Sequence, residues 1–186
     1  IADNTYVIGM VANYRTQKNH NFFIRSINKF KKNKVPFKVI LAGRNINKNN
    51  KELIGEIKKN NLEREFILLD NINNVDFLLN VFDVFVLTSK FGESFSNVLI
   101  ESMATSVPCI STNIGASAFI VKNCGWILNE FDHIELANLL FKVYNKKTNK
   151  ENWKELKYSN RKRVENHFSL PVMIEKYEKI WKTTYI

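Results

Sequence analysis

Six short apolar runs, separated by segments of helical length, constrain the fold of this chain more than any other feature. The runs are nearly continuous in valine, isoleucine, leucine and phenylalanine, as expected for strands that are covered on both faces. They span residues 6–13, 37–44, 65–70, 84–89, 108–113 and 125–129. This alternation predicts an α/β fold: a doubly wound parallel sheet of about six strands, with right-handed crossovers and helices on both faces.

The segments between the first strands have the apolar spacing of helices. Residues 19–34 carry an apolar stripe with lysines on the opposite face, which indicates an amphipathic helix. The stripe consists of Phe22, Phe23, Ile27 and Phe30. Shorter helices are predicted within residues 50–61 and 74–82.

The chain after residue 129 reads as three helices without further strands, over residues 131–147, 149–168 and 170–186. The last of them also carries an apolar stripe with lysines opposite. This stripe comprises Met173, Tyr177, Ile180, Trp181 and Tyr185. Two interpretations follow: the stripe packs on this same domain, or it contacts a neighbour that is absent from the chain.

The length of 186 residues suits one domain, and the net charge of +10 is unevenly distributed. Residues 15–51 contain eleven Lys or Arg and no acidic residue, and residues 142–186 contain twelve Lys or Arg against five Glu. Such a distribution suggests an anionic partner: nucleic acid, an anionic membrane surface or a phosphorylated small molecule. The alternative is that the charge serves solubility alone.

Cysteine, histidine and hydropathy patterns narrow the class of protein. Cys109 and Cys124 are interpreted as reduced, packed thiols of a cytoplasmic protein. The three histidines are scattered and no Asp-x-Asp occurs, so no metal site is expected. No apolar run reaches membrane-spanning length and the N-terminus does not read as a signal peptide. The chain starts without Met, which suggests a piece of a longer protein.

Two glutamates flank a predicted helix start after the fourth strand. Ser96 is a natural N-cap for a helix from Asn97 to Thr105, with Glu93 in the loop before it and Glu101 one turn inside it. A helix N-terminus binds phosphate through its free amides and its dipole. Ligands of open parallel sheets bind at this carboxyl edge.

The spacing of these residues indicates the order in which the groups of a ligand would lie along the site. Glu101 lies about 5.4 Å along the helix from its tip, a suitable offset between a diphosphate and the ribose of the same nucleotide. Glu93 can then reach only what is attached to the far phosphate, which a nucleotide sugar satisfies. The small polar Ser94 leaves the backbone approachable, and Arg15 and Lys18 after the first strand supply cations for the diphosphate.

Together these residues resemble the C-terminal, donor-binding half of a GT-B fold glycosyltransferase, of the large retaining family that includes capsular and lipopolysaccharide enzymes. The family shows two Glu separated by seven residues in a setting similar to "ESFSNVLIESMATSVPCIST". "VANYRTQKNHNFFIRSI" is similar to its basic loop and first helix, and "HFSLPVMIEKYEKIW" to its closing helix. The likeness covers nearly the whole chain and implies a Rossmann-like domain.

The resemblance implies roles for individual residues. Glu93 would contact the hydroxyls of the donor sugar, and Glu101 the ribose. The backbone at Phe95, Ser96 and Asn97 would hold the sugar and the diphosphate. Lys18 and a nearby Arg would neutralise the departing nucleoside diphosphate, a transfer that retains configuration and needs neither metal nor other cofactor. The co-substrate would be a UDP- or GDP-sugar.

The sequence departs from the family pattern at several positions. The usual Arg falls on Asn13, where Arg15 is the candidate substitute. Ser106 replaces the Gly preferred at the helix end, which predicts left-handed strain. The usual Gly-Gly-x-x-Glu becomes "GASAF", so that Phe119 replaces the Glu, and "DNINN" replaces a Gly after the third strand. These changes leave the sugar and the nucleobase open.

The resemblance also implies that residues 1–186 form the nucleotide-sugar-binding domain and that an N-terminal acceptor domain is absent. The acceptor would be a glycan or a lipid-linked glycan, with contact to the anionic inner face of the membrane, and no nucleic acid is expected. Three alternatives stay open: a sugar-nucleotide epimerase half of the same fold, a basic nucleic-acid-binding module, and a donor domain that has lost activity.

Overall fold

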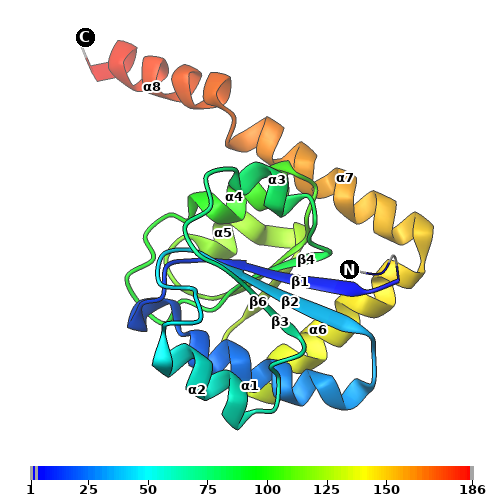
Figure 1. Cartoon of the computed structure of the whole chain (residues 1–186). Helices are drawn as coiled ribbons and strands as arrows, with labels where there is room; N and C mark the ends of the chain where they lie inside the picture. Colours follow the sequence, from blue (N-terminus) through cyan, green and yellow to red (C-terminus); the bar gives the residue numbers. More distant parts are fainter. Residues whose placement is uncertain (1, 3, 185–186) are drawn as a thin grey trace.

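The computed structural model describes residue 2 and residues 4–184, and its centre is a parallel sheet (Figure 1). The strands are β1 (Tyr6–Val11), β2 (Phe37–Ala42), β3 (Phe66–Leu69), β4 (Val84–Leu87), β5 (Cys109–Thr112) and β6 (Trp126–Leu128). Their order is β3-β2-β1-β4-β5-β6, and every neighbouring pair is parallel. The predicted strands and the doubly wound α/β class are therefore confirmed.

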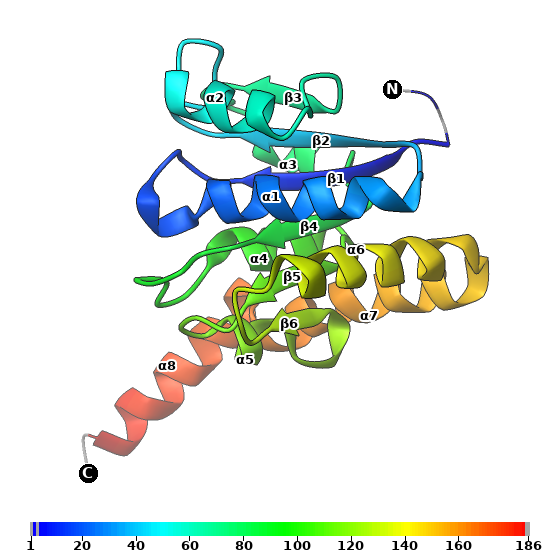
Figure 2. The same ribbon diagram turned by 90° about the horizontal axis from the view of Figure 1, so that it is seen from below.

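Both faces of the sheet are covered, as the nearly continuous apolar runs predicted (Figures 1 and 2). One face carries α1 (His20–Phe30), α2 (Lys51–Lys59) and α6 (His133–Thr148). The opposite face carries α3 (Val75–Leu79), α4 (Asn97–Ala104), α5 (Ser117–Val121) and α7 (Lys150–His167). The predicted helices are all present. The short α5, and the 3-10 helices at Thr16–Lys18, Lys31–Asn33 and Lys122–Cys124, were not predicted.

Alternate residues of the central strands fill two separate cores. Ile8 and Met10 of β1 belong to the core beneath α1, α2 and α6. Val7 of the same strand and Phe85 of β4 belong to the core beneath α3, α4, α5 and α7. Successive side chains of a strand point to opposite faces, so a strand covered on both faces must be apolar at every position.

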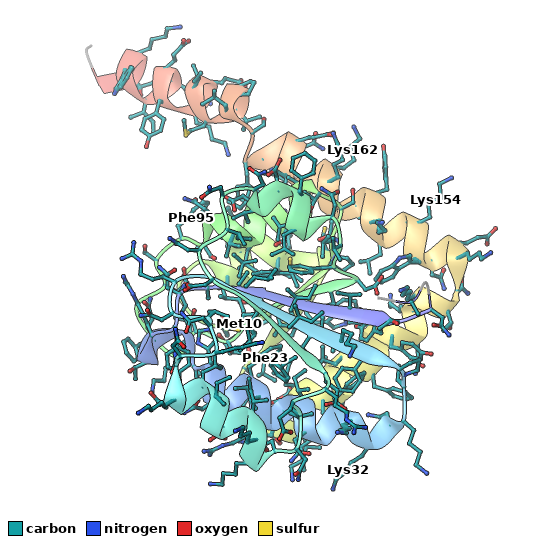
Figure 3. The ribbon with its side chains drawn as sticks, in the orientation of Figure 1. Met10, Phe23, Lys32, Phe95, Lys154 and Lys162 are labelled. Carbon is teal, nitrogen blue, oxygen red and sulfur yellow. The ribbon has the colours of Figure 1, made fainter. Side chains whose placement is uncertain are left out.

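The apolar stripe of α1 is buried as predicted. Phe23, Ile27 and Phe30 have no exposed surface, and Phe23 lies against the sheet on the same side as Met10 (Figure 3). This packing fixes α1, and with it the loop that connects β1 to the first turn of α1. That loop contains Lys18.

The C-terminal helix α8 (Leu170–Thr184) carries the apolar stripe that was predicted either to pack on this domain or to contact a neighbour. Figures 1 and 2 show α8 projecting away from the sheet and its helical layers. Met173, Tyr177 and Trp181 are 46%, 53% and 61% exposed. The stripe is therefore not buried in either core of this domain; Met173, Tyr177 and Ile180 instead line a cavity that α4 also lines. Tyr185 lies outside the described residues.

The end of α4 shows the strained backbone that the sequence predicted. Ser106 has a φ of 64°, in the left-handed region that residues with a Cβ adopt only at a cost. The amide of Ser106 donates to the carbonyl of Met103 and the amide of Val107 donates to that of Ser102, which closes the helix. The turn allows the chain to enter β5 directly.

Candidate functional site

Two loops meet at the carboxyl edge of the sheet, one after β1 and one after β4. The Thr88 hydroxyl donates to the Lys18 carbonyl at 2.9 Å, and the Lys90 amide donates to the Gln17 carbonyl at 2.9 Å. Residues that are about 70 positions apart in the sequence therefore form one surface. Figure 2 shows both loops on the same side of the molecule.

Glu93 lies at the centre of this surface and is held by both loops. Its Oε2 accepts a hydrogen bond from the Ser89 hydroxyl at 2.7 Å and forms an ion pair with the Lys18 ammonium group. Only 11% of the Glu93 side chain and 18% of the Lys18 side chain are exposed. The pairing satisfies two charges that would otherwise be costly in a largely buried setting.

The N-terminus of α4 opens beside Glu93 without a side-chain cap. Ser96 has extended backbone angles and is the N-cap, as predicted, but its side chain makes no capping hydrogen bond. The Ser96 Oγ is buried and has no hydrogen-bond partner among the described residues. The first amides of a helix and an unpaired hydroxyl together suit an anion with several oxygens.

Asn97 and Glu101 lie on the exposed side of α4 and line a cavity of about 560 Å³. Phe95 and Phe119 also line this cavity. Its volume is in the range of small-molecule sites. Asn97 and Glu101 therefore line this cavity, whereas Glu93 is not among its lining residues and pairs with Lys18.

The remaining predicted site residues have different surroundings. Asn13 accepts a hydrogen bond from the Arg44 amide at 2.9 Å, so its side chain joins the loops after β1 and β2. Arg15 is exposed and lines a small cavity of about 90 Å³ together with Lys90, apart from the ion pair of Lys18. Ser94 is exposed, and its carbonyl accepts from the Ala116 amide at 3.0 Å.

Phe119, which replaces the Glu of the family pattern, belongs to an aromatic cluster. Its ring centroid is 5.8 Å from that of Phe168, and Phe168 is 6.1 Å from Phe95. The Arg163 guanidinium lies 5.9 Å from the Phe119 centroid and donates to the carbonyls of Phe119 and Ile120. The Arg163 guanidinium thus has a cation–π partner and two carbonyl acceptors, although no carboxylate is present at position 119.

Three residues of the site were missed by the sequence analysis. Ser89 was taken only as the end of a strand, whereas its hydroxyl binds Glu93. Gln17 donates from Nε2 to the Gly92 carbonyl at 2.7 Å. Gly115 approaches the backbone of Glu93. Of these three residues, only Gly115 could have been found from the sequence, because it begins the "GASAF" segment that departs from the family pattern.

His20, next to this surface, makes stability dependent on pH. Its side chain is 3% exposed, and burial lowers the pKa of the imidazole to about 4. The Ala12 backbone partly opposes this shift and Lys18 adds to it. The unfolded chain binds the proton near pH 6.5, so between pH 6.5 and 4 it holds more protons than the folded chain. Stability therefore falls as the pH falls through this window.

We expect the contribution of His20 to decrease by about 2 kcal/mol between pH 7 and pH 5. Urea unfolding of the wild type at both pH values measures the loss, and His20→Gln should reduce it. His167→Gln, at the exposed end of α7, is the control. An equal pH dependence in the wild type and His20→Gln would contradict the assignment.

Among the residues that the structure describes, no group of three or more His, Cys, Asp or Glu side chains could hold a metal ion. In the same part of the chain, no helix combines the length and the hydropathy needed to span a bilayer.

Curated proteins of known sequence show clear similarity to this chain. It is 30% identical over 190 residues to "Capsular polysaccharide biosynthesis glycosyltransferase CapM" of Staphylococcus aureus, covering 91% of this chain and 48% of that protein. It is 30% identical over 149 residues to an Escherichia coli "UDP-Gal:alpha-D-GlcNAc-diphosphoundecaprenol alpha-1,3-galactosyltransferase", covering 75% of this chain and 37% of that protein. The chain spans less than half the length of either relative.

Solved structures share the fold at lower identity. A glycosyltransferase from Rickettsia africae superposes with a TM-score of 0.88 at 22% identity, covering 98% of this chain and 48% of that one. Anabaena Alr3699/HepE, solved in complex with UDP and glucose, superposes with a TM-score of 0.81 at 18% identity, covering 97% and 49%. Both support the assignment of the fold as one half of a GT-B glycosyltransferase.

The family model described as "Glycosyl transferases group 1" matches residues 1–163. With the relatives and the fold, this match means that the chain belongs to the group 1 glycosyl transferases.

Proposed function

We propose that residues 1–186 are the nucleotide-sugar-binding domain of a longer glycosyltransferase, which transfers a sugar with retention and without a metal. The family and the GT-B fold support the reaction class, and the coverage of less than half of each relative supports a missing acceptor-binding part. The isolated chain should bind the donor without transferring its sugar.

The observation that carries this proposal is the uncapped N-terminus of α4 beside a lysine and a glutamate. The unpaired Ser96 hydroxyl and the first α4 amides offer donors to a diphosphate. Lys18 pairs with Glu93, three residues before this tip, and supplies a cation. We assign Glu93 the role of accepting from the hydroxyls of a sugar attached to the far phosphate.

The chemistry required of these residues is stabilisation of a leaving group. The bond from the sugar C1 to the phosphate oxygen breaks, and a bond from C1 to the acceptor oxygen forms on the same face. The acceptor proton passes to an oxygen of the departing phosphate. Lys18, Arg15 and the helix tip lower the energy of the charge that develops on the diphosphate.

The acceptor that we propose is a glycan or a lipid-linked glycan, bound through the missing part of the protein. Two relatives carry capsular polysaccharide biosynthesis and a diphosphoundecaprenol substrate in their names. The net charge of +10 would attract the chain to an anionic cytoplasmic leaflet, by about 1 kcal/mol for each Lys or Arg that lies next to the membrane surface. UDP and GDP are both candidate nucleotides of the donor.

Glu101→Ala tests the ribose assignment. We expect about tenfold weaker binding of the preferred nucleoside diphosphate, because a hydrogen bond to a charged group contributes about 1.5 kcal/mol at the lower end of its range. Titration calorimetry with UDP, GDP and ADP gives the dissociation constants. Glu155→Ala, which removes an exposed glutamate from α7, is the matched control and should leave them unchanged.

The same titrations distinguish the alternatives. Binding of UDP or GDP that Glu101→Ala weakens and Glu155→Ala does not weaken supports the proposal. Indifference of the wild type to all three nucleotides, together with tight, salt-sensitive binding of RNA, would favour a nucleic-acid-binding module instead.

A further inference from the structure

We infer that Gly115, in the loop after β5, is a positioning residue that sets the place of Glu93 through a backbone-to-backbone contact. The inference rests on the proposed function of Glu93 as the residue that contacts the donor sugar.

Gly115 leaves no space for a side chain. A Cβ at this position would lie 1.5 Å from the carbonyl oxygen of Glu93 and 2.9 Å from that of Ser94. The neighbouring Ala116 amide donates to the same Ser94 carbonyl at 3.0 Å. Gly115 also has a φ of 59°, which favours glycine independently of the contact. The loop after β5 therefore lies directly against the peptide units on either side of Ser94.

The loop after β1 also holds the Glu93 loop. Gln17 donates from its side chain to the Gly92 carbonyl, and its own carbonyl accepts from the Lys90 amide. Gln17 and Gly115 thus contact the Glu93 loop from two different loops. The hydrogen bond from Ser89 orients the Glu93 carboxylate.

A side chain at position 115 must displace Glu93, because ordinary contacts between a carbon and an oxygen are more than 3 Å long. A displacement of about 2 Å exceeds the roughly 0.5 Å tolerance of a functional group in a binding site. The contact to the sugar should be lost, whereas the α4 amides, Lys18 and Glu101 remain to hold the nucleoside diphosphate. The expected signature is a selective loss for the sugar nucleotide.

The experiment compares Gly115→Ala, Gly115→Asn and the control Gly55→Ala, since a Cβ at Gly55 in α2 meets nothing within 4 Å. Titration with UDP and UDP-glucose, and with GDP and GDP-mannose, gives the two affinities of each variant. We expect both Gly115 variants to bind the sugar nucleotide about tenfold more weakly and the free diphosphate within twofold of wild type. Asn tolerates a positive φ better than Ala does, so Gly115→Asn tests the effect of the Cβ contact with little added cost from the backbone angle.

A second readout needs no ligand: amide hydrogen exchange of residues 92–96. It should accelerate about tenfold in both Gly115 variants and not in Gly55→Ala. If the wild type binds no nucleotide, the proposed function fails, and the exchange rates still decide whether Gly115 holds the loop. Wild-type exchange and wild-type sugar preference in Gly115→Asn would overturn the inference.

Gln17→Ala keeps the test decisive if both Gly115 variants unfold. It removes the hydrogen bond to the Gly92 carbonyl without adding atoms. We expect faster exchange at residues 92–96 and about threefold weaker binding of the sugar nucleotide. Unchanged exchange in Gln17→Ala would show that the loop does not depend on its contacts with neighbouring loops, and the inference would be wrong.

Discussion

Lys18→Ala should weaken the binding of the preferred nucleoside diphosphate by about 100-fold. The substitution removes the cation closest to Glu93 and leaves that carboxylate largely buried and without its ion pair. The diphosphate then loses an attractive charge and meets an uncompensated negative one. A hydrogen bond between charged groups contributes up to about 3 kcal/mol, and 100-fold in dissociation constant corresponds to about 2.8 kcal/mol.

Lys32→Ala is the matched control for this prediction. It removes the same charge from an exposed position beyond the end of α1, far from the loop of Lys18 (Figure 3). Calorimetric titration at constant ionic strength should therefore give wild-type affinity for Lys32→Ala. Equal losses in the two variants would mean that the general positive charge, and not the position of Lys18, attracts the nucleotide.

Phe23→Ala should lower the free energy of unfolding by about 3–5 kcal/mol. Phe23 is fully buried between α1 and the sheet, so the substitution removes apolar contacts and leaves a cavity. Domains of this size are stable by only about 5–15 kcal/mol, so a large part of the total would be lost. Guanidinium unfolding followed by circular dichroism measures the change.

Phe77→Ala separates burial from residue type. Phe77 lies on α3 and is 71% exposed, so its truncation should change stability by no more than about 0.5 kcal/mol. If Phe23→Ala lowered the free energy of unfolding as little as Phe77→Ala, the described packing of α1 against the sheet would be wrong.

The class of the fold could be predicted from the sequence because its signal is local and repeated. Most strands are nearly continuous apolar runs such as Tyr6–Val11, and α1 has an apolar stripe at helical spacing. Such patterns arise because one or both faces of an element are buried, and they can be read without knowing which other elements pack against it. The five-residue α5 was missed because so short a helix shows less than two turns of periodicity.

The site could be predicted only in part. Ser96 was identified as the N-cap of α4 from its position before an apolar helix, and the structure agrees on the boundary. The environment of Glu93 could not be predicted, because Lys18 is 75 positions away and Ser89 carries no pattern of its own. The sequence also could not predict that Arg15 lies apart from the Lys18–Glu93 ion pair, because its position depends on the fold of its loop.

The sequence by itself determined which residues form strands, which segments form the longer helices and where α4 begins, at the N-cap Ser96. These properties depend on periodicity and capping within a few residues, which a linear pattern records. Only the tertiary structure decided that Lys18 pairs with Glu93, that Gly115 lies against the Glu93 carbonyl, and that α8 leaves the body. Those contacts join distant segments, and their geometry depends on how the whole sheet brings its loops together.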